Sequence, residues 1–172
     1  MENQNNALVI ERVFAAPVEE VWKYWSDAEL FKQWWGPKQF TCPAVEMDFR
    51  VGGKVLGCMR GAPQEGMPVQ DFWSIGTYKE IIPLKKIVVT DSFADEKGNV
   101  VPSIHYGMEG MPLEMLVTIE FEEIEGDPST GSAQATKMTL THSNLGDIAE
   151  EIKKDMDQGW NESFDKIVDH LK

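Results

Sequence analysis

The sequence predicts an α+β protein in which a curved antiparallel sheet of seven strands wraps around a long C-terminal helix, with two short helices after the first strand. Apolar and polar residues alternate along most of the chain, which is typical of antiparallel strands with one covered face. Apolar residues recur at helical spacing directly after the first alternating segment and again at the C-terminal end. Together the two patterns favour one sheet that buries its apolar face against one helix.

A single domain accounts for the whole chain, residues 1–172. With 172 residues, of which 42% are hydrophobic, the chain is long enough to bury roughly two-thirds of its unfolded surface in one core. This composition is ordinary for a globular protein and differs from that of a disordered one. We find no internal repeat and no linker that would divide the sequence.

The charge balance excludes some classes of partner. The chain has 29 acidic and 16 basic residues and a formal net charge of −13, so its field repels the phosphates of nucleic acids and of anionic membranes. No apolar run approaches the roughly 20 residues that span a bilayer. The start, MENQNNALVI, lacks the basic region of a secretory signal. We therefore expect a cytoplasmic protein that binds neither nucleic acid nor membrane.

The N-terminal part is expected to form one strand and two short helices. Residues 7–14 alternate and predict the strand. Residues 17–25 begin with proline and continue with apolar residues at helical spacing, and the capping box SDAE at 26–29 begins the second helix. A Gly-Pro pair ends that helix directly after Trp34 and Trp35. Neighbouring side chains on a helix point about 100° apart, so we expect Trp34 in the core and Trp35 at an edge, a pocket mouth or an interface.

Six further strands follow the helices. They are predicted at residues 44–51, 54–61, 72–83, 85–95, 116–123 and 135–143. Gly52 and Gly53 are typical of a tight turn between the first two of these strands. A turn centred on the two glycines places Arg60 opposite Val45, on the inner face of the hairpin.

The two cysteines, Cys42 and Cys58, are predicted to be free thiols. In the same register they lie several residues apart along the hairpin and on opposite faces of it. Neither has an adjacent histidine or the spacing of a metal site. We interpret both as packed apolar side chains.

The chain is predicted to end in a long amphipathic helix that begins near Asp147. Its apolar residues form one stripe, namely Ile148, Ile152, Met156, Trp160, Phe164, Ile167 and Leu171. Charged residues fill the opposite face. A helix that lies across a strongly curved sheet does not fill it completely, so a cavity between the two is expected.

Several segments resemble those of a known superfamily. The runs RVFAAPVEEVWKYWSDAELFKQWWGPKQF, VGGKVLGCMRG, GTYKEIIPLKKIVVTDSF, VTIEFEE, KMTLTH and QGWNESFDKIVDHL are similar, in this order, to the SRPBCC superfamily. The similar branch is the one named after the C-terminal domain of the activator of the ninety-kilodalton heat-shock-protein ATPase. The resemblance covers nearly the whole chain and implies a helix-grip fold with a deep, largely apolar cavity under the last helix. Members include lipid and hormone carriers, polyketide cyclases and co-chaperone domains, so the resemblance alone does not assign a function.

The candidate pocket combines polar groups on apolar strand faces with aromatic and methionine side chains. Asp91 and His142 each share a strand face with apolar neighbours, and Arg60 faces inward in the register given above. The expected ligand-pocket residues are Trp34, Met59, Arg60, Trp73, Asp91, Phe121, Leu140, His142, Trp160 and Phe164. Two alternatives stay open: a structural role near a strand end for the polar members, and simple core packing for the apolar ones.

These residues favour binding of a small hydrophobic or aromatic ligand between the sheet and the C-terminal helix. No nucleophile motif, phosphate-binding glycine pattern or metal-ligand spacing occurs, so we expect no catalytic residue, cofactor or metal. Two other functions stay open. One is a cavity enzyme of cyclase or hydrolase type that uses Asp91, His142 or Arg60 as acid–base groups. The other is a module that binds a chaperone, another protein or a second copy of the chain, which an exposed apolar patch around Trp35 would favour.

Overall fold

The computed structural model of the chain describes residues 6–172 except Pro128 and Thr130. Its elements in chain order are β1 (Leu8–Phe14), α1 (Val18–Ser26), α2 (Ala28–Phe31), β2 (Val45–Met47), β3 (Lys54–Gly61), β4 (Gln70–Ile82), β5 (Lys86–Ala94), the 3₁₀ helix η1 (Ser103–Tyr106), β6 (Met115–Glu125), β7 (Gln134–Ser143) and α3 (Glu150–Leu171). The first five residues, on which the expected absence of a secretory signal partly rests, lie outside this description.

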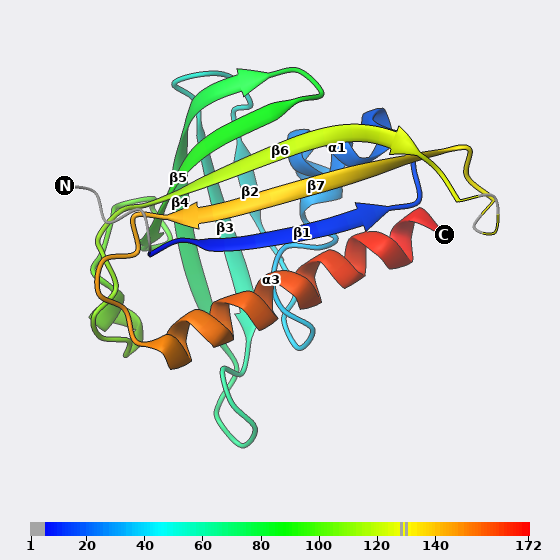
Figure 1. Cartoon of the computed structure of the whole chain (residues 1–172). Helices are drawn as coiled ribbons and strands as arrows, with labels where there is room; N and C mark the ends of the chain where they lie inside the picture. Colours follow the sequence, from blue (N-terminus) through cyan, green and yellow to red (C-terminus); the bar gives the residue numbers. More distant parts are fainter. Residues whose placement is uncertain (1–5, 128, 130) are drawn as a thin grey trace.

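All seven strands form one antiparallel sheet in the order β1-β7-β6-β5-β4-β3-β2. Figure 1 shows the sheet curving around α3, which runs along its concave side. The pairing of β4 with β5 shifts between Tyr78 and Glu80, and such an irregularity bends the strands locally. The predicted fold class is therefore confirmed: an α+β helix-grip fold with a seven-stranded curved sheet, a long C-terminal helix and two short helices after the first strand.

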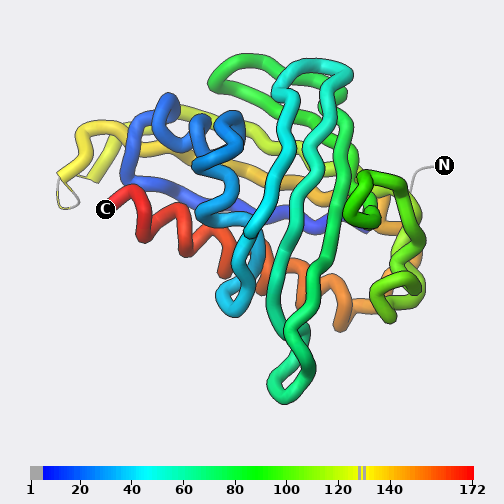
Figure 2. The backbone as a smooth tube through the Cα atoms, turned by 180° about the vertical axis from the view of Figure 1, so that it is seen from behind, coloured from blue at the N-terminus to red at the C-terminus, as the bar shows by residue number. Residues whose placement is uncertain are grey.

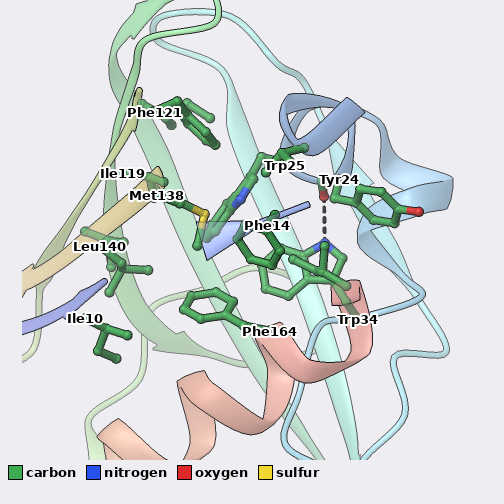
Figure 3. Close-up of a cluster of buried hydrophobic side chains, with 14 of the residues drawn as sticks. Ile10, Phe14, Tyr24, Trp25, Trp34, Ile119, Phe121, Met138, Leu140 and Phe164 are labelled. Atoms are coloured by element: carbon green, nitrogen blue, oxygen red, sulfur yellow. Dashed lines mark hydrogen bonds between the residues drawn. The ribbon is translucent and has the colours of Figure 1, made fainter. Parts of the chain in front are cut away.

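The hydrophobic core lies where the sheet meets the C-terminal half of α3. Phe164 and Ile167 of α3 are fully buried, and the Phe164 ring centroid lies 6.5 Å from that of Phe14 and 6.0 Å from that of Trp34. Trp34 is fully buried, as predicted, and its indole N–H donates a 2.7 Å hydrogen bond to the carbonyl of Tyr24 (Figure 3). The two N-terminal helices thus close the core at this end of α3, as Figure 2 shows from behind.

The predicted register of the first hairpin is wrong. Val45 lies opposite Gly57 rather than Arg60, because the turn extends from Asp48 to Gly53 instead of being confined to two glycines. The difference is three residues, and an odd shift moves each side chain to the other face of the pair. The strand β2 is correspondingly shorter than the segment predicted at 44–51.

Two helix starts also differ from the prediction. Asp27, not Ser26, caps α2, and its carboxylate accepts hydrogen bonds from two backbone N–H groups in the first turn. The Ser26 hydroxyl donates instead to the carbonyl of Trp22 within α1. The last helix begins at Glu150, after the expected cap at Asp147. Within the described part of the chain, no helix combines the length and the apolar character needed to cross a membrane.

Candidate functional site

A cavity of about 440 Å³ lies between the sheet and the N-terminal half of α3. Sites for small molecules have volumes of roughly 300–1,000 Å³, so this cavity has the size of a ligand site. Strands β3, β4, β5 and β7, the helix α3 and the segments 35–40 and 108–115 all contribute to its wall. The lining residues are Trp35, Gly36, Pro37, Phe40, Met59, Pro63, Phe72, Ser74, Asp91, Phe93, Met108, Met111, Met115, His142, Ile152, Asp155, Met156, Gly159, Trp160 and Ser163.

A narrower cleft of about 40 Å³ adjoins this cavity. Four residues line both spaces: Trp35, Ser74, Asp91 and Trp160. The cleft is otherwise lined largely by apolar side chains that include Trp25 and Phe31 of the two N-terminal helices. The Asp91 carboxylate therefore lies where the cavity meets the cleft.

Small residues on the sheet help to form the cavity. Gly57 of β3 and Ser74 of β4 lie directly opposite each other, so the sheet has two minimal side chains side by side at this point. A Cβ atom at position 57 would lie 3.3 Å from the indole nitrogen of Trp35, which means that the glycine lets this ring rest against β3. Gly57 lines the cleft, and Ser74 lines both the cleft and the cavity.

Three polar side chains from three elements meet in the cavity wall. The Nε1–H group of Trp160 on α3 donates a 3.2 Å hydrogen bond to Nδ1 of His142 on β7. The other ring nitrogen of His142, Nε2, lies 3.1 Å from Oδ2 of Asp91 on β5. Because Nδ1 accepts a hydrogen bond, it carries no proton, and the neutral ring then carries its proton on Nε2, next to Asp91.

The histidine is buried, but its second hydrogen bond is incomplete. His142 is only 3% exposed, and Nε2 is buried without a well-directed hydrogen bond to any acceptor in the described part of the chain. Its closeness to Asp91 is therefore an electrostatic contact rather than an aligned N–H···O bond. A small movement of the carboxylate would complete the bond, and buried donors of this kind are rare enough to mark a site of interest.

Trp35 forms a wall of the cavity rather than an exposed patch. It is half-buried, its ring stacks on Phe31 with centroids 4.7 Å apart, and it lies 5.6 Å from the ring of Trp160. Its indole nitrogen is buried and has no hydrogen-bond partner in the described structure. Of the three positions predicted for Trp35, the structure therefore selects the pocket.

Four of the expected pocket residues line the cavity. They are Met59, Asp91, His142 and Trp160. Met59 lies on β3 opposite Phe72 of β4, and both side chains face the cavity. The structure therefore places the two predicted polar groups of β5 and β7 together, with the predicted helix tryptophan in contact with one of them.

Four other expected pocket residues belong to the core instead. Trp34, Leu140 and Phe164 are fully buried, and Phe121 is 7% exposed, and none of them lines the cavity or the adjoining cleft. Figure 3 shows all four within the cluster of buried hydrophobic side chains. The physical reason is local packing. The Phe164 ring contacts Phe14 and Trp34, and the Phe121 ring contacts Trp22 of α1, so these side chains fill the space between the elements that carry them.

Arg60 and Trp73 lie on the opposite face of the sheet from the cavity. Alternation along β3 and β4 places Met59 and Phe72 inward, so the adjacent Arg60 and Trp73 point outward. Arg60 is an exposed residue that forms two hydrogen bonds with the carboxylate of Asp71, at 2.7 and 3.0 Å. The expectation that Arg60 faces the pocket followed from the wrong hairpin register.

Lys166 is a supporting residue that the sequence did not single out. Its Nζ atom donates hydrogen bonds of 2.8, 2.9 and 2.8 Å to the carbonyls of Gly36, Pro37 and Phe40. Burial lowers the pKa of its ammonium group from the ordinary value. Since these three residues line the cavity, Lys166 holds one wall in place from behind. Its position in the helix next to the apolar Ile167 is the sequence signal that could have indicated partial burial.

The two cysteine thiols lie away from the cavity, and the described residues form no metal site. In the part of the chain that the structure describes, no three His, Cys, Asp or Glu side chains converge as metal ligands. Cys42 and Cys58 are buried free thiols, as predicted. Burial is the main cause that raises the pKa of both, that of Cys58 to about 11. Neither cysteine lines the cavity.

The chain is similar to proteins of one family and to several solved structures. The family model described as activator of Hsp90 ATPase homolog 1-like protein matches residues 15–172. A crystal structure of a protein from Nitrosomonas europaea is 20% identical, with a TM-score of 0.72, and the match covers 98% of this chain and 96% of that one. The AHSA1 protein of Silicibacter pomeroyi is 23% identical, with a TM-score of 0.68 and 96% of each chain covered.

A solution structure of a protein from Staphylococcus epidermidis is similar to the same degree. It is 24% identical, has a TM-score of 0.71, and the match covers 98% of this chain and 90% of that one. No curated protein matches the chain. At these identities the solved structures establish the fold, and the function has to be argued from the site.

Proposed function

The chain belongs to the family of activator of Hsp90 ATPase homolog 1-like proteins, and from that premise we propose that it binds a small hydrophobic or aromatic molecule in the cavity between the sheet and the N-terminal half of α3. One observation carries the proposal: a cavity of about 440 Å³ in which half of the lining residues are aromatic or methionine side chains and a quarter are polar. Pockets with this composition are typical of small-molecule sites.

The site favours binding over acid–base catalysis. A general base needs a free lone pair within reach of the substrate proton. The Nδ1 lone pair of His142 accepts the hydrogen bond from Trp160, and Nε2 faces Asp91. Nδ1 is therefore occupied and Nε2 is buried beside Asp91, so the ring suits orientation of a ligand better than proton transfer.

The packing of Trp35 also favours a pocket over a protein-binding patch. An interaction module would need this ring to be part of an exposed apolar surface. The ring instead stacks on Phe31, contacts Trp160 and lines the cavity. Binding of a chaperone, which the family name suggests, is the alternative that the experiment below would favour if the cavity proved unable to bind small molecules.

The proposal is tested by filling the cavity. In Ser74→Phe the new ring occupies the point where the cavity meets the cleft, while Thr141→Phe on β7 places the same ring on the other face of the sheet, next to His142. Binding of neutral naphthalene derivatives such as 2-naphthylethanol is measured by tryptophan fluorescence and calorimetry. We expect wild type and Thr141→Phe to bind alike and Ser74→Phe to bind at least tenfold more weakly, because its ring takes the ligand's space.

Circular dichroism and thermal unfolding show that each variant is folded. If no member of a broad aromatic series, with neutral and charged members, binds the wild type, the proposed function is wrong. It is equally contradicted if a folded Ser74→Phe variant binds as tightly as wild type, since the ligand would then lie elsewhere.

A further inference from the structure

We propose that the cavity selects molecules that combine an apolar or aromatic body with a protonated amine, and that the amine binds the carboxylate of Asp91 beside the rings of Trp35 and Trp160. This inference rests on the proposed function, because it names the class of ligand for the same site. It draws on the charges around the cavity, the state of Asp91 and the aromatic side chains next to it.

The charges that line the cavity are of one sign. Asp91 and Asp155 are its acidic residues, and His142 is its one other titratable side chain among the described lining residues. Those lining residues include no lysine or arginine. The whole chain has a net charge of −13, which attracts cations and repels anions at long range. A carboxylate or phosphate placed here would lie beside Asp91 without a cation to compensate it.

Asp91 keeps its negative charge available to a ligand. Its one ion-pair partner among the described residues is His142. Because Trp160 donates its indole hydrogen to Nδ1, that nitrogen would have to lose this bond before it could accept a proton. Nε2 of His142 lies 3.1 Å from Asp91 without an aligned hydrogen bond, so the Asp91 carboxylate can still accept a hydrogen bond from a ligand. The Asp91 side chain is 24% exposed, and it lines both spaces.

The aromatic surroundings suit a cation. Trp35 and Trp160 line the same two spaces as Asp91, and their rings lie 5.6 Å apart at an interplanar angle of 75°. Tryptophan faces attract ammonium groups, more strongly when water is excluded. An ammonium group between a carboxylate and two indole rings would gain a charge-assisted hydrogen bond and cation–π contacts together. The apolar body of the ligand would then contact Phe72, Phe93 and the methionines of the wall.

The test compares three probes of nearly equal size and shape: 2-naphthylethylamine, 2-naphthylethanol and 2-naphthylacetate. Calorimetry on the wild-type protein at pH 7 should show the amine binding at least tenfold more tightly than the alcohol, and the alcohol more tightly than the carboxylate. The order follows from the Asp91 carboxylate, which no lysine or arginine of the lining compensates. The comparison needs no variant, so it remains valid even if substitutions at the site impair folding.

Two matched variants then assign the effect. Asp91→Asn keeps the shape of the side chain and removes its charge, and Asp155→Asn does the same at the other acidic residue of the lining. We expect Asp91→Asn to reduce the preference for the amine over the alcohol to less than threefold, whereas Asp155→Asn retains it.

The outcomes separate this inference from the proposed function. If the amine and the alcohol bind equally, or the carboxylate binds most tightly, the amine selection is overturned while the cavity remains a ligand site. If the preference persists in Asp91→Asn and is lost in Asp155→Asn, the assignment to Asp91 is overturned. If none of the three probes binds and the broad aromatic series also fails, the proposed function itself is wrong.

Discussion

Trp34 and Trp35 are neighbours in sequence with different surroundings, and the difference follows from helix geometry. Trp34 is fully buried, and its N–H group is satisfied by the Tyr24 carbonyl. Trp35 points about 100° away, stacks on Phe31 and lines the cavity. At the residue scale the sequence could predict this division, because it depends on local geometry. It could not predict which of three environments receives Trp35, because that depends on how far α3 lies from the sheet.

The two tryptophans should therefore differ in their effect on stability. Trp34→Ala removes a fully buried ring and leaves a cavity, so we expect it to lower the free energy of unfolding by about 3–5 kcal/mol. Trp35→Ala removes a half-buried ring that already borders open space, and its cost should be clearly smaller. Urea denaturation of both variants measures the difference. Equal, large losses at both positions would contradict the division.

At the scale of elements, α3 has two functions along one apolar stripe. Phe164 and Ile167 in the C-terminal half are fully buried against the sheet. Ile152, Met156 and Trp160 in the N-terminal half line the cavity. The sequence predicts the stripe, because apolar residues recur at helical spacing. It does not contain a local signal for the distance between helix and sheet, and this is why four core residues were expected in the pocket.

This division predicts that stability and binding can be changed separately. Phe164→Ala should lower the free energy of unfolding by about 3–5 kcal/mol, and below its melting temperature it should change the affinity for 2-naphthylethanol less than threefold. Met156→Ala enlarges a space that already exists, so it should cost less than about 1.5 kcal/mol and weaken binding several-fold. Thermal unfolding and fluorescence titration of both variants provide the test. A large loss of affinity in folded Phe164→Ala, with none in Met156→Ala, would show that the ligand lies along the other half of the helix.

The hairpin between β2 and β3 shows why a correct set of strands does not give a correct set of inward residues. Alternation located both strands, since it is a local property of the chain. The register depends on the turn, and hydrogen bonds of the turn backbone, such as Gly52 N–H to the Tyr78 carbonyl, come from a strand far along the sequence. Arg60 was therefore assigned to the wrong face, whereas Asp91 and His142, which were assigned from alternation within their own strands, line the cavity.

At the scale of the whole molecule, the fold buries several thiol and phenol groups that can ionise. Burial raises the pKa of Cys42, of Cys58 to about 11, and of Tyr78 well above its usual range. Tyr78 lies 4% exposed within the core. In the unfolded chain, thiols ionise near pH 8.5 and phenols near pH 10. The folded protein therefore retains these protons at pH values at which the unfolded chain has released them.

The sign of the resulting pH dependence is fixed by this difference. Where the folded state binds more protons than the unfolded state, stability falls as pH rises. The contribution of Cys58 is complete below about pH 8.5 and is lost progressively as pH rises towards its folded pKa of about 11. The lowered pKa of Lys166 acts in the opposite direction, because the folded state releases that proton first. Burial also raises the pKa of Tyr24 and Tyr106, and five groups with raised pKa values outweigh one lysine, so we expect net destabilisation in alkaline solution.

Urea denaturation under reducing conditions from pH 8 to pH 11 measures this loss. The Cys58→Ala, Tyr78→Phe double variant should be less stable than wild type at pH 8, because it loses packing. Between pH 8 and pH 11 its free energy of unfolding should fall by about 1–3 kcal/mol less than that of wild type. The net charge makes self-repulsion grow with pH in both proteins, so the difference between their slopes reports the buried groups alone. Parallel curves for the two proteins would mean that Cys58 and Tyr78 ionise as readily in the folded state as in the unfolded chain, and that the core around them admits water.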